Sequence, residues 1–174
     1  MSTTPFWGKY RGVVVNNIDP EQRGRIQVIV PAVTGETPSN WALPCVPVAG
    51  ISEGIFCVPP MKAAVWVEYE DGDSDKPIWV GGFWSEAAEV PTTASAPPPI
   101  PPGQNIVIQT TLQNSVVISD SAPTPKSGGI ALSSPLGASI IVNDTGIYIS
   151  NGKGAEIQMV GPTVTVNQGA LVIT

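Results

Sequence analysis

The chain has 174 residues, and 8 Lys and Arg against 14 Asp and Glu give it a formal net charge of −6. Its 18 Gly and 19 Pro leave no room for long helices, and its hydrophobic share of 42% against 13% charged residues is the reverse of a disordered composition. Helical bundles and intrinsic disorder are therefore excluded. The absence of histidine removes His-based acid/base and nucleophilic catalysis and every His-containing metal site. An all-β fold is expected.

The N-terminal residues MSTTPFWGKYRG contain no charged segment followed by an apolar one, so we expect no signal peptide and synthesis in the cytoplasm. Cys45 and Cys57 stand in alternating apolar segments and are too few for a metal site or a secreted disulfide framework. We expect them to be buried free thiols, although a disulfide between adjacent strands stays open.

Residues 1–90 hold 6 of the 8 basic and 11 of the 14 acidic residues and show dense strand signals. Each predicted strand is short, rich in Val, Ile and aromatic residues, and bounded by turn residues such as Asp19-Pro20 or Pro59-Pro60. Five or six such strands suit a small closed barrel, which leaves no exposed edges. The predicted strands cover residues 9–16, 24–30, 41–48, 54–58, 63–70 and 76–84.

Residues 91–104 contain six prolines, which favour an extended polyproline II linker. Beyond them the chain repeats one unit, an apolar residue, any residue and a second apolar residue, with Gly, Pro, Asn and Asp at the corners between units. From Ile130 onward the first members are spaced by 10, 7, 10, 7 and 7 residues. Two alternating gaps sum to 17, so Ile130, Ile147 and Val164 are predicted to be equivalent positions in a stack of short strands.

Such a ribbon alone would present one apolar face and rows of unpaired backbone groups, with few charges to protect its edges. We therefore expect three copies to wind around an axis as an intertwined three-chain β-helix, with strand edges paired between chains and the apolar residues inside. The predicted trimer core consists of Ile130, Leu132, Ile140, Val142, Ile147, Ile149, Ile157, Met159, Val164, Val166, Leu171 and Ile173.

The first half also carries a family likeness. Residues 12–20 (GVVVNNIDP) and 24–31 (GRIQVIVP) resemble the opening of the OB-fold of phage baseplate assembly protein V, a module shared with VgrG-like spikes of type VI secretion and related contractile injection systems. Residues 41–44, 47–50, 59–60, 65–73 and 76–82 follow the order and approximate spacing of that family. The resemblance implies an OB-fold barrel over residues 1–90, the linker over 91–104 and a trimeric β-helix spike over 105–174.

The resemblance further implies a structural function, namely a homotrimeric spike below the baseplate hub that punctures the target cell envelope. Implied partners are the hub, a PAAR-type tip protein docking at Val172, Ile173 and Thr174, and inner tube and cargo proteins, with only transient contact with the target membrane. The protein is expected to assemble in the cytoplasm into a phage tail or tail-like particle, with extracellular release as a further option. No enzyme activity, cofactor or metal is implied, because the linker stands where some phage spikes carry a lysozyme domain and the histidines of an apical iron site are missing.

Acidic residues of the first half raise two chemical alternatives. Asp71, Asp73 and Asp75 alternate as in a calcium loop, but Lys76 and Gly82 stand where an EF-hand needs Gly and a bidentate Glu, so a hairpin tip with solvated carboxylates is predicted. Glu68 and Glu70 share one strand face at a spacing that could suit paired carboxylates of a hydrolase, but nothing apolar nearby in sequence indicates a raised pKa.

A third alternative is an OB-fold nucleic-acid-binding protein with an oligomerising β-tail. Lys9, Arg11, Arg23 and Arg25 cluster on the first two predicted strands near Phe6, Trp7 and Tyr10. The negative net charge opposes phosphate binding, so no nucleic-acid partner is predicted. The remaining large aromatic residues, Trp66, Trp79, Phe83 and Trp84, are interpreted as barrel core or interchain contacts.

Overall fold

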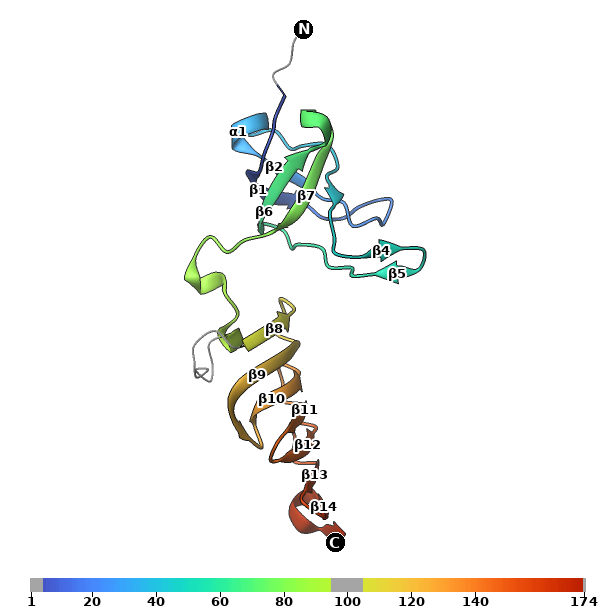
Figure 1. The fold of residues 1–174 in the computed structure, drawn as a ribbon, viewed down its shortest axis with the longest axis vertical. Coiled ribbons are helices and arrows are strands. Elements are labelled where there is room, and N and C mark those ends of the chain that lie inside the picture. Colours follow the sequence, from blue (N-terminus) through green and yellow to red (C-terminus); the bar gives the residue numbers. More distant parts are fainter. Residues whose placement is uncertain (1–4, 95–104, 174) are drawn as a thin grey trace. The chain divides into compact units, whose positions relative to one another are not determined.

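The structure, a computed structural model, describes residues 5–94 and 105–173. The chain divides into two compact units, Met1–Ala87 and Ala88–Thr174 (Figure 1). The linker predicted for residues 91–104 lies outside the described residues from residue 95 on. Two single 3₁₀ turns precede that point, η2 (Ala87–Glu89) and η3 (Thr92–Ala94).

The first unit is a small β-barrel. Its sheet has five strands in the order β2-β1-β6-β7-β3, and the segment before β3 returns to β2 through the bridges Ile26↔Ala42 and Ile29↔Pro38, which close the ring. The elements of this unit are β1 (Tyr10–Asn16), β2 (Gln27–Ile29), α1 (Pro31–Thr34), β3 (Leu43–Pro44), β4 (Ala49–Gly50), β5 (Glu53–Gly54), β6 (Ala64–Tyr69), η1 (Glu70–Gly72) and β7 (Pro77–Gly82).

Alternation along the strands builds the barrel core, as the sequence predicted. In β6, Val65, Val67 and Tyr69 are buried, whereas the residues between them are half-buried. They pack with side chains from β1, β2 and β7, including Trp79, whose indole Nε1 donates a hydrogen bond of 3.1 Å to the Gly24 carbonyl oxygen. The prediction that Trp79 belongs to the core is thereby confirmed, whereas Trp84 is exposed.

The strand predicted for residues 54–58 is wrong. Only Gly54 belongs to a strand, the two-residue β5, which pairs with β4. Beyond it, the Ile55 amide donates to the Val48 carbonyl oxygen, and the chain continues without strand structure to β6. The apolar, β-branched composition imitated a barrel strand, but β3 already fills the place between β7 and β2 that such a strand would need. We call residues 45–58 the arm.

The two cysteines lie at the ends of this arm. Both Cys45 and Cys57 are free thiols, and both are exposed, so the prediction that they are buried is wrong. At both ends of the arm the neighbouring residue takes the inward position, because Val46 and Val58 pack against the barrel core and the cysteines beside them face outward.

A buried carboxylate organises the connection between β1 and β2. Asp19 accepts hydrogen bonds from the backbone amides of Glu21, Arg23 and Arg25 and from the Arg25 guanidinium, whose Nη2 lies 2.7 Å from Asp19 Oδ1. The two side chains are only 12% and 4% exposed. The Arg25 guanidinium holds the pKa of the Asp19 carboxyl well below its usual range, and the hydrogen bonds from the three backbone amides lower it further.

An Asp19→Asn variant should therefore lower the melting temperature of the barrel by several degrees at neutral pH. Because the folded-state pKa of Asp19 is depressed, its stabilising effect is fully present above the unfolded-state pKa of about 4 and is lost as the pH falls through the folded-state value. The gap between wild type and variant should narrow below about pH 4. Near-ultraviolet circular dichroism melts at several pH values measure it, with Glu68→Gln as the control, because it removes the exposed Lys9–Glu68 pair elsewhere on the barrel. A gap that stayed constant from pH 7 to pH 2 would contradict this role.

The second unit is a single sheet of eight strands whose order in space is their order in sequence, β8 to β15. Every neighbouring pair is antiparallel, so the unit is an uninterrupted meander, or ladder. Its strands are β8 (Asn105–Gln109), β9 (Ser115–Thr124), β10 (Ser127–Ser133), β11 (Ser139–Asn143), β12 (Gly146–Ser150), β13 (Glu156–Val160), β14 (Thr163–Val166) and β15 (Leu171–Ile173), with the 3₁₀ turn η4 (Asn167–Gly169) before the last.

The alternating spacing of 10 and 7 residues reflects two kinds of connection. Tight turns join β11 to β12 and β13 to β14, where Asn143 pairs with Gly146 and Val160 with Thr163. Five-residue loops join β10 to β11 and β12 to β13. The stack of short strands is confirmed, but one reason given for a trimer is wrong, because the strand edges expected to pair between chains already pair within the chain.

Candidate trimer interface

One face of the ladder carries Ile, Val, Leu or Met side chains on all eight strands. Each strand contributes the two apolar members of its unit, and the register places them directly opposite those of the next strand. They form two columns, which together we call the apolar face. One column is Ile106, Ile118, Ile130, Val142, Ile147, Met159, Val164 and Ile173, and the other is Ile108, Val116, Leu132, Ile140, Ile149, Ile157, Val166 and Leu171.

All twelve residues predicted for the trimer core lie in these columns. Ile130, Ile147 and Val164, predicted to be equivalent, occupy successive same-direction strands of one column. The structure adds Ile106, Ile108, Val116 and Ile118. Their units were visible in the sequence, but the long β9–β10 hairpin separates Val116 from Ile130 by more than either regular gap.

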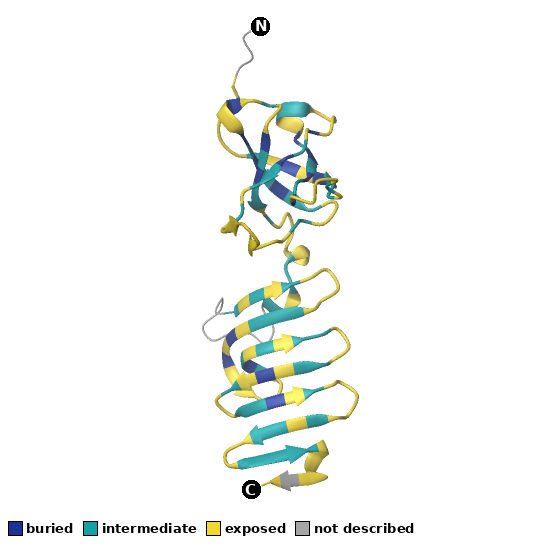
Figure 2. Cartoon of the chain, turned by 90° about the vertical axis from the view of Figure 1, so that its right-hand side faces the viewer, coloured by how far each residue is buried: buried dark blue, intermediate teal, exposed yellow. Residues whose placement is uncertain are grey.

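None of these sixteen side chains is buried in the single chain. Those that rank as exposed range from 37% for Ile149 to 69% for Ile108. The strands of the ladder are accordingly coloured mainly in the intermediate and exposed classes (Figure 2). With about 4.8 Å between strands, the seven spacings make this apolar face about 34 Å long. A continuous exposed apolar surface of that size indicates an interface.

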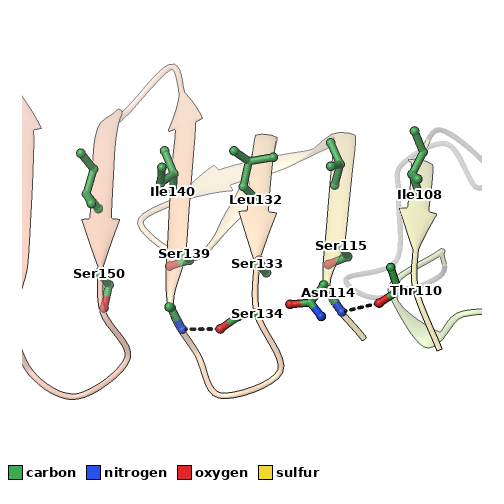
Figure 3. Close-up of a pocket in the computed structure, with 13 residues that line it drawn as sticks. Ile108, Thr110, Asn114, Ser115, Leu132, Ser133, Ser134, Ser139, Ile140 and Ser150 are labelled. Carbon is green, nitrogen blue, oxygen red and sulfur yellow. Dashed lines mark hydrogen bonds between the residues drawn. The ribbon is translucent and has the colours of Figure 1, made fainter. Parts of the chain in front are cut away.

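The apolar face is hollowed where β8 to β12 meet. Ile108, Leu132 and Ile140 extend side by side from their strands, and serines such as Ser133 and Ser139 mark the strand ends beyond them (Figure 3). The depression is lined almost wholly by carbon and carries no charged side chain. Its chemistry suits another apolar surface better than a polar ligand.

The longer connections at this edge close by one recurring hydrogen bond. The side-chain oxygen of the first loop residue accepts from the backbone amide four residues on, in Thr110 with Asn114, Ser134 with Ala138 and Asn151 with Ala155, at 3.2, 3.1 and 3.1 Å. The first two of these bonds are drawn in Figure 3. Successive loops stack so closely that a Cβ on Gly152, at φ +71°, would lie 2.6 Å from the Leu136 carbonyl oxygen. The ladder therefore has a defined register at its edge.

The opposite face of the ladder has more of its side chains buried or hydrogen-bonded within the chain than the apolar face has. Ile141 and Tyr148, paired across β11 and β12, are buried there, and the Tyr148 hydroxyl lies 2.9 Å from Thr145 Oγ1. Asn143 Nδ2 donates to the carbonyl oxygens of Thr124 and Ser127 in the β9–β10 hairpin. The apolar face has no buried member over its full length, and the five charged residues of the ladder all lie outside its columns. These are Asp120, Lys126, Asp144, Lys153 and Glu156.

The predicted docking end for a tip protein falls on β15. Ile173 is the last member of its column, and it is exposed. Thr174 and the side chain of Val172 lie outside what the structure describes.

The basic residues that raised a nucleic-acid alternative are engaged within the barrel unit. Lys9 bonds to Glu68, and Arg23 and Arg25 to Asp19 or Glu21. The Arg11 guanidinium lies over the rings of Trp66 and Phe83, 5.6 and 5.5 Å from their centroids. Carboxylates thus pair with three of the four cations, which reduces the positive charge that this region offers to phosphates.

The acidic residues that raised the hydrolase and calcium alternatives are placed differently from what either site needs. Glu68 is tied to Lys9, and Glu70 begins the η1 turn outside β6, so the two carboxylates do not share a strand face as expected. Asp71, Asp73 and Asp75 lie in the β6–β7 connection, the predicted hairpin tip, where Asp73 accepts from the Asp75 amide. Over residues 5–94 and 105–173 no three His, Cys, Asp or Glu side chains gather as metal ligands would. The same residues include no helix of the length and hydrophobicity needed to cross a bilayer.

A closed barrel joined to a ladder with one uncovered apolar face defines a structural protein that assembles with copies of itself. Comparison with known families agrees with this class. Residues 10–84 match the type VI secretion system/phage-baseplate injector OB domain, and residues 105–172 match the phage baseplate V C-terminal trimerisation domain. No curated protein matches the chain.

The chain belongs to the phage baseplate V family, with an OB domain followed by a trimerisation domain. Both matched families are structural baseplate domains and not enzyme families. The protein is therefore a structural component of a phage tail particle. The match of its C-terminal residues to a trimerisation domain supports a homotrimer that associates with the baseplate.

Proposed function

We propose that three copies bring their apolar faces together around a common axis and so build the spike of an injection baseplate. The observation that carries the proposal is the pair of apolar columns, unbroken over the eight strands from β8 to β15. Covering a half-exposed aliphatic side chain contributes on the order of 1 kcal/mol, so the face of one chain gains on the order of 16 kcal/mol. Three faces gain about 48 kcal/mol, which exceeds the cost of the two association steps that build a trimer, about 4–15 kcal/mol each.

In this assembly each chain forms one wall of a three-sided prism. Strands β9 to β14 have hydrogen-bonded neighbours on both sides within their own chain, so the contact between chains is made by side chains. The chains can twist around the axis and so intertwine as whole walls, while strand exchange between them is not required. The twelve residues predicted from sequence, with the four added above, are the proposed trimer core.

The mechanical role follows from this construction. A dry core of aliphatic side chains and a continuous ladder of backbone hydrogen bonds resist bending, because packed interiors have low compressibility. Force from sheath contraction can then pass along the rod into the target envelope without any bond-making chemistry. The barrel is the part that we assign to the hub, and the end of the chain at Val172, Ile173 and Thr174 is the part that we assign to a PAAR-type tip protein.

Label transfer from assembled particles tests the puncturing role. A Lys153→Cys variant in a Cys45→Ser/Cys57→Ser background, which removes the two exposed native thiols, places one thiol on the exposed β12–β13 loop, outside the apolar face, where a biotin label does not disturb packing. After the particles contract on target cells, we expect the label in the cell-envelope or periplasmic fraction, and uncontracted particles serve as the control. Label that stayed with the baseplate after contraction would show that the spike does not enter the envelope.

A further inference from the structure

The arm, residues 45–58, leaves the barrel between two anchors, Val46 and Val58, which pack against the barrel core. Its β4 and β5 are held together by the pairs Ala49↔Gly54 and Gly50↔Glu53, and no residue of the arm is buried. Figure 1 shows this hairpin projecting beside the barrel. A two-stranded hairpin of this size is at best marginally stable in water, so something else must hold it.

The arm exposes four large apolar side chains to solvent. Ile51 at its tip is 99% exposed, Phe56 is 75% exposed, and Ile55 and Val48 are exposed beside them. The Phe56 ring lies beside Gly24 of the barrel, where a Cβ would lie 3.2 Å from the ring. The arm carries a single charged residue, Glu53. Four clustered large apolar side chains around one carboxylate are a surface built for contact.

The outer side of the barrel offers a surface that matches it. Trp66 and Phe83 lie with ring centroids 4.8 Å apart under the Arg11 guanidinium, and Val13 is exposed on the same strand as Arg11. Lys9, Arg23 and Arg25 have carboxylate partners, whereas Arg11 contacts aromatic rings. Aromatic residues with Arg are enriched at the centres of protein interfaces, and Arg11 is opposite in charge to Glu53.

We propose that the arm of each subunit packs on the Arg11–Trp66–Phe83 surface of a neighbouring subunit's barrel, with Glu53 facing Arg11. The occupant is a second copy because the trimerisation domain ties three barrels together through the connecting residues 88–104, which raises their effective concentration to the millimolar range. Such a head-to-tail contact closes on itself around a three-fold axis. The inference rests on the homotrimer and adds a second contact between its subunits.

Hydrogen exchange combined with charge reversal tests the contact in the full chain. In the wild-type trimer we expect the amides of residues 48–56 to exchange at least about tenfold more slowly than in the Arg11→Glu and Glu53→Arg variants. The double variant Arg11→Glu/Glu53→Arg restores the opposite charges and should restore the protection. Lys62→Glu, an exposed charge reversal elsewhere on the barrel, should leave the protection unchanged.

The outcomes separate this inference from the proposed function. Light scattering should show a trimer for every variant, because the apolar face of the ladder is untouched. A wild-type protein that is not a trimer overturns both proposals. A wild-type trimer whose arm exchanges freely, an arm protected only after a hub protein is added, or protection that survives Arg11→Glu overturns the arm contact alone.

Discussion

Ile147→Asp should abolish the trimer at micromolar concentration. Ile147 lies in the middle of one apolar column, opposite Val142 and Met159, so a trimer of the variant would bring three carboxylates together near its axis. The lost burial of three isoleucines costs about 3 kcal/mol per trimer, and burying each unpaired carboxylate costs several kcal/mol more. Sedimentation velocity should show monomers, with a barrel that still gives its near-ultraviolet circular dichroism signal.

The matched control is Gln158→Asp, which places the same carboxylate on the neighbouring strand but on the opposite face. Gln158 pairs with Tyr148, outside the two columns. This variant should remain a trimer and melt close to the wild type. If Ile147→Asp were a stable trimer, or if both variants dissociated alike, the apolar face would not be the interface.

Removal of residues 147–163 should shorten the spike and leave it trimeric. These 17 residues are one full repeat, and their loss joins Gly146 to Val164, which then takes the place of Ile147 opposite Val142. Val166 likewise takes the place of Ile149 opposite Ile140. Both columns stay continuous, and the ladder loses two strands, or about 10 Å of length. Electron microscopy of the purified trimers measures the change.

Removal of residues 147–162 is the sharp control, because it differs by one residue. Thr163 then follows Gly146, and the side chains of Val164 and Val166 turn to the opposite face while threonines enter the columns. A one-residue shift reverses every side chain of a strand, so we expect aggregation or loss of the trimer. Equal behaviour of the two deletions would show that the 17-residue repeat does not set the register.

Local sequence patterns were sufficient to predict the strands of the ladder. The apolar-x-apolar unit has the two-residue period of a strand, and Asn, Asp and Gly stand between the units. The signals for strand and turn are therefore both local in the sequence. The positions equivalent by the 17-residue repeat, Ile130, Ile147 and Val164, share one column for that reason. The buried members of β6 were predictable in the same way.

Patterns failed where the outcome depends on partners distant in sequence. Residues 54–58 read as a strand, but the barrel closes through the bridges Ile26↔Ala42 and Ile29↔Pro38, which leave them outside. The cysteines were expected inside for the same reason and lie on the surface. The engagement of Lys9 by Glu68, 59 residues away, could not be read from their separate positions.

The amino-acid sequence by itself determined an all-β chain, the repeat of the ladder and the residues of its apolar columns, because hydrophobic alternation and turn chemistry act over a few neighbouring residues. Only the tertiary structure decided that the ladder strands pair with their own neighbours and that the arm stays outside the barrel. Strand pairing depends on segments far apart in the chain, because the favoured arrangement is the one that leaves the fewest backbone groups unpaired.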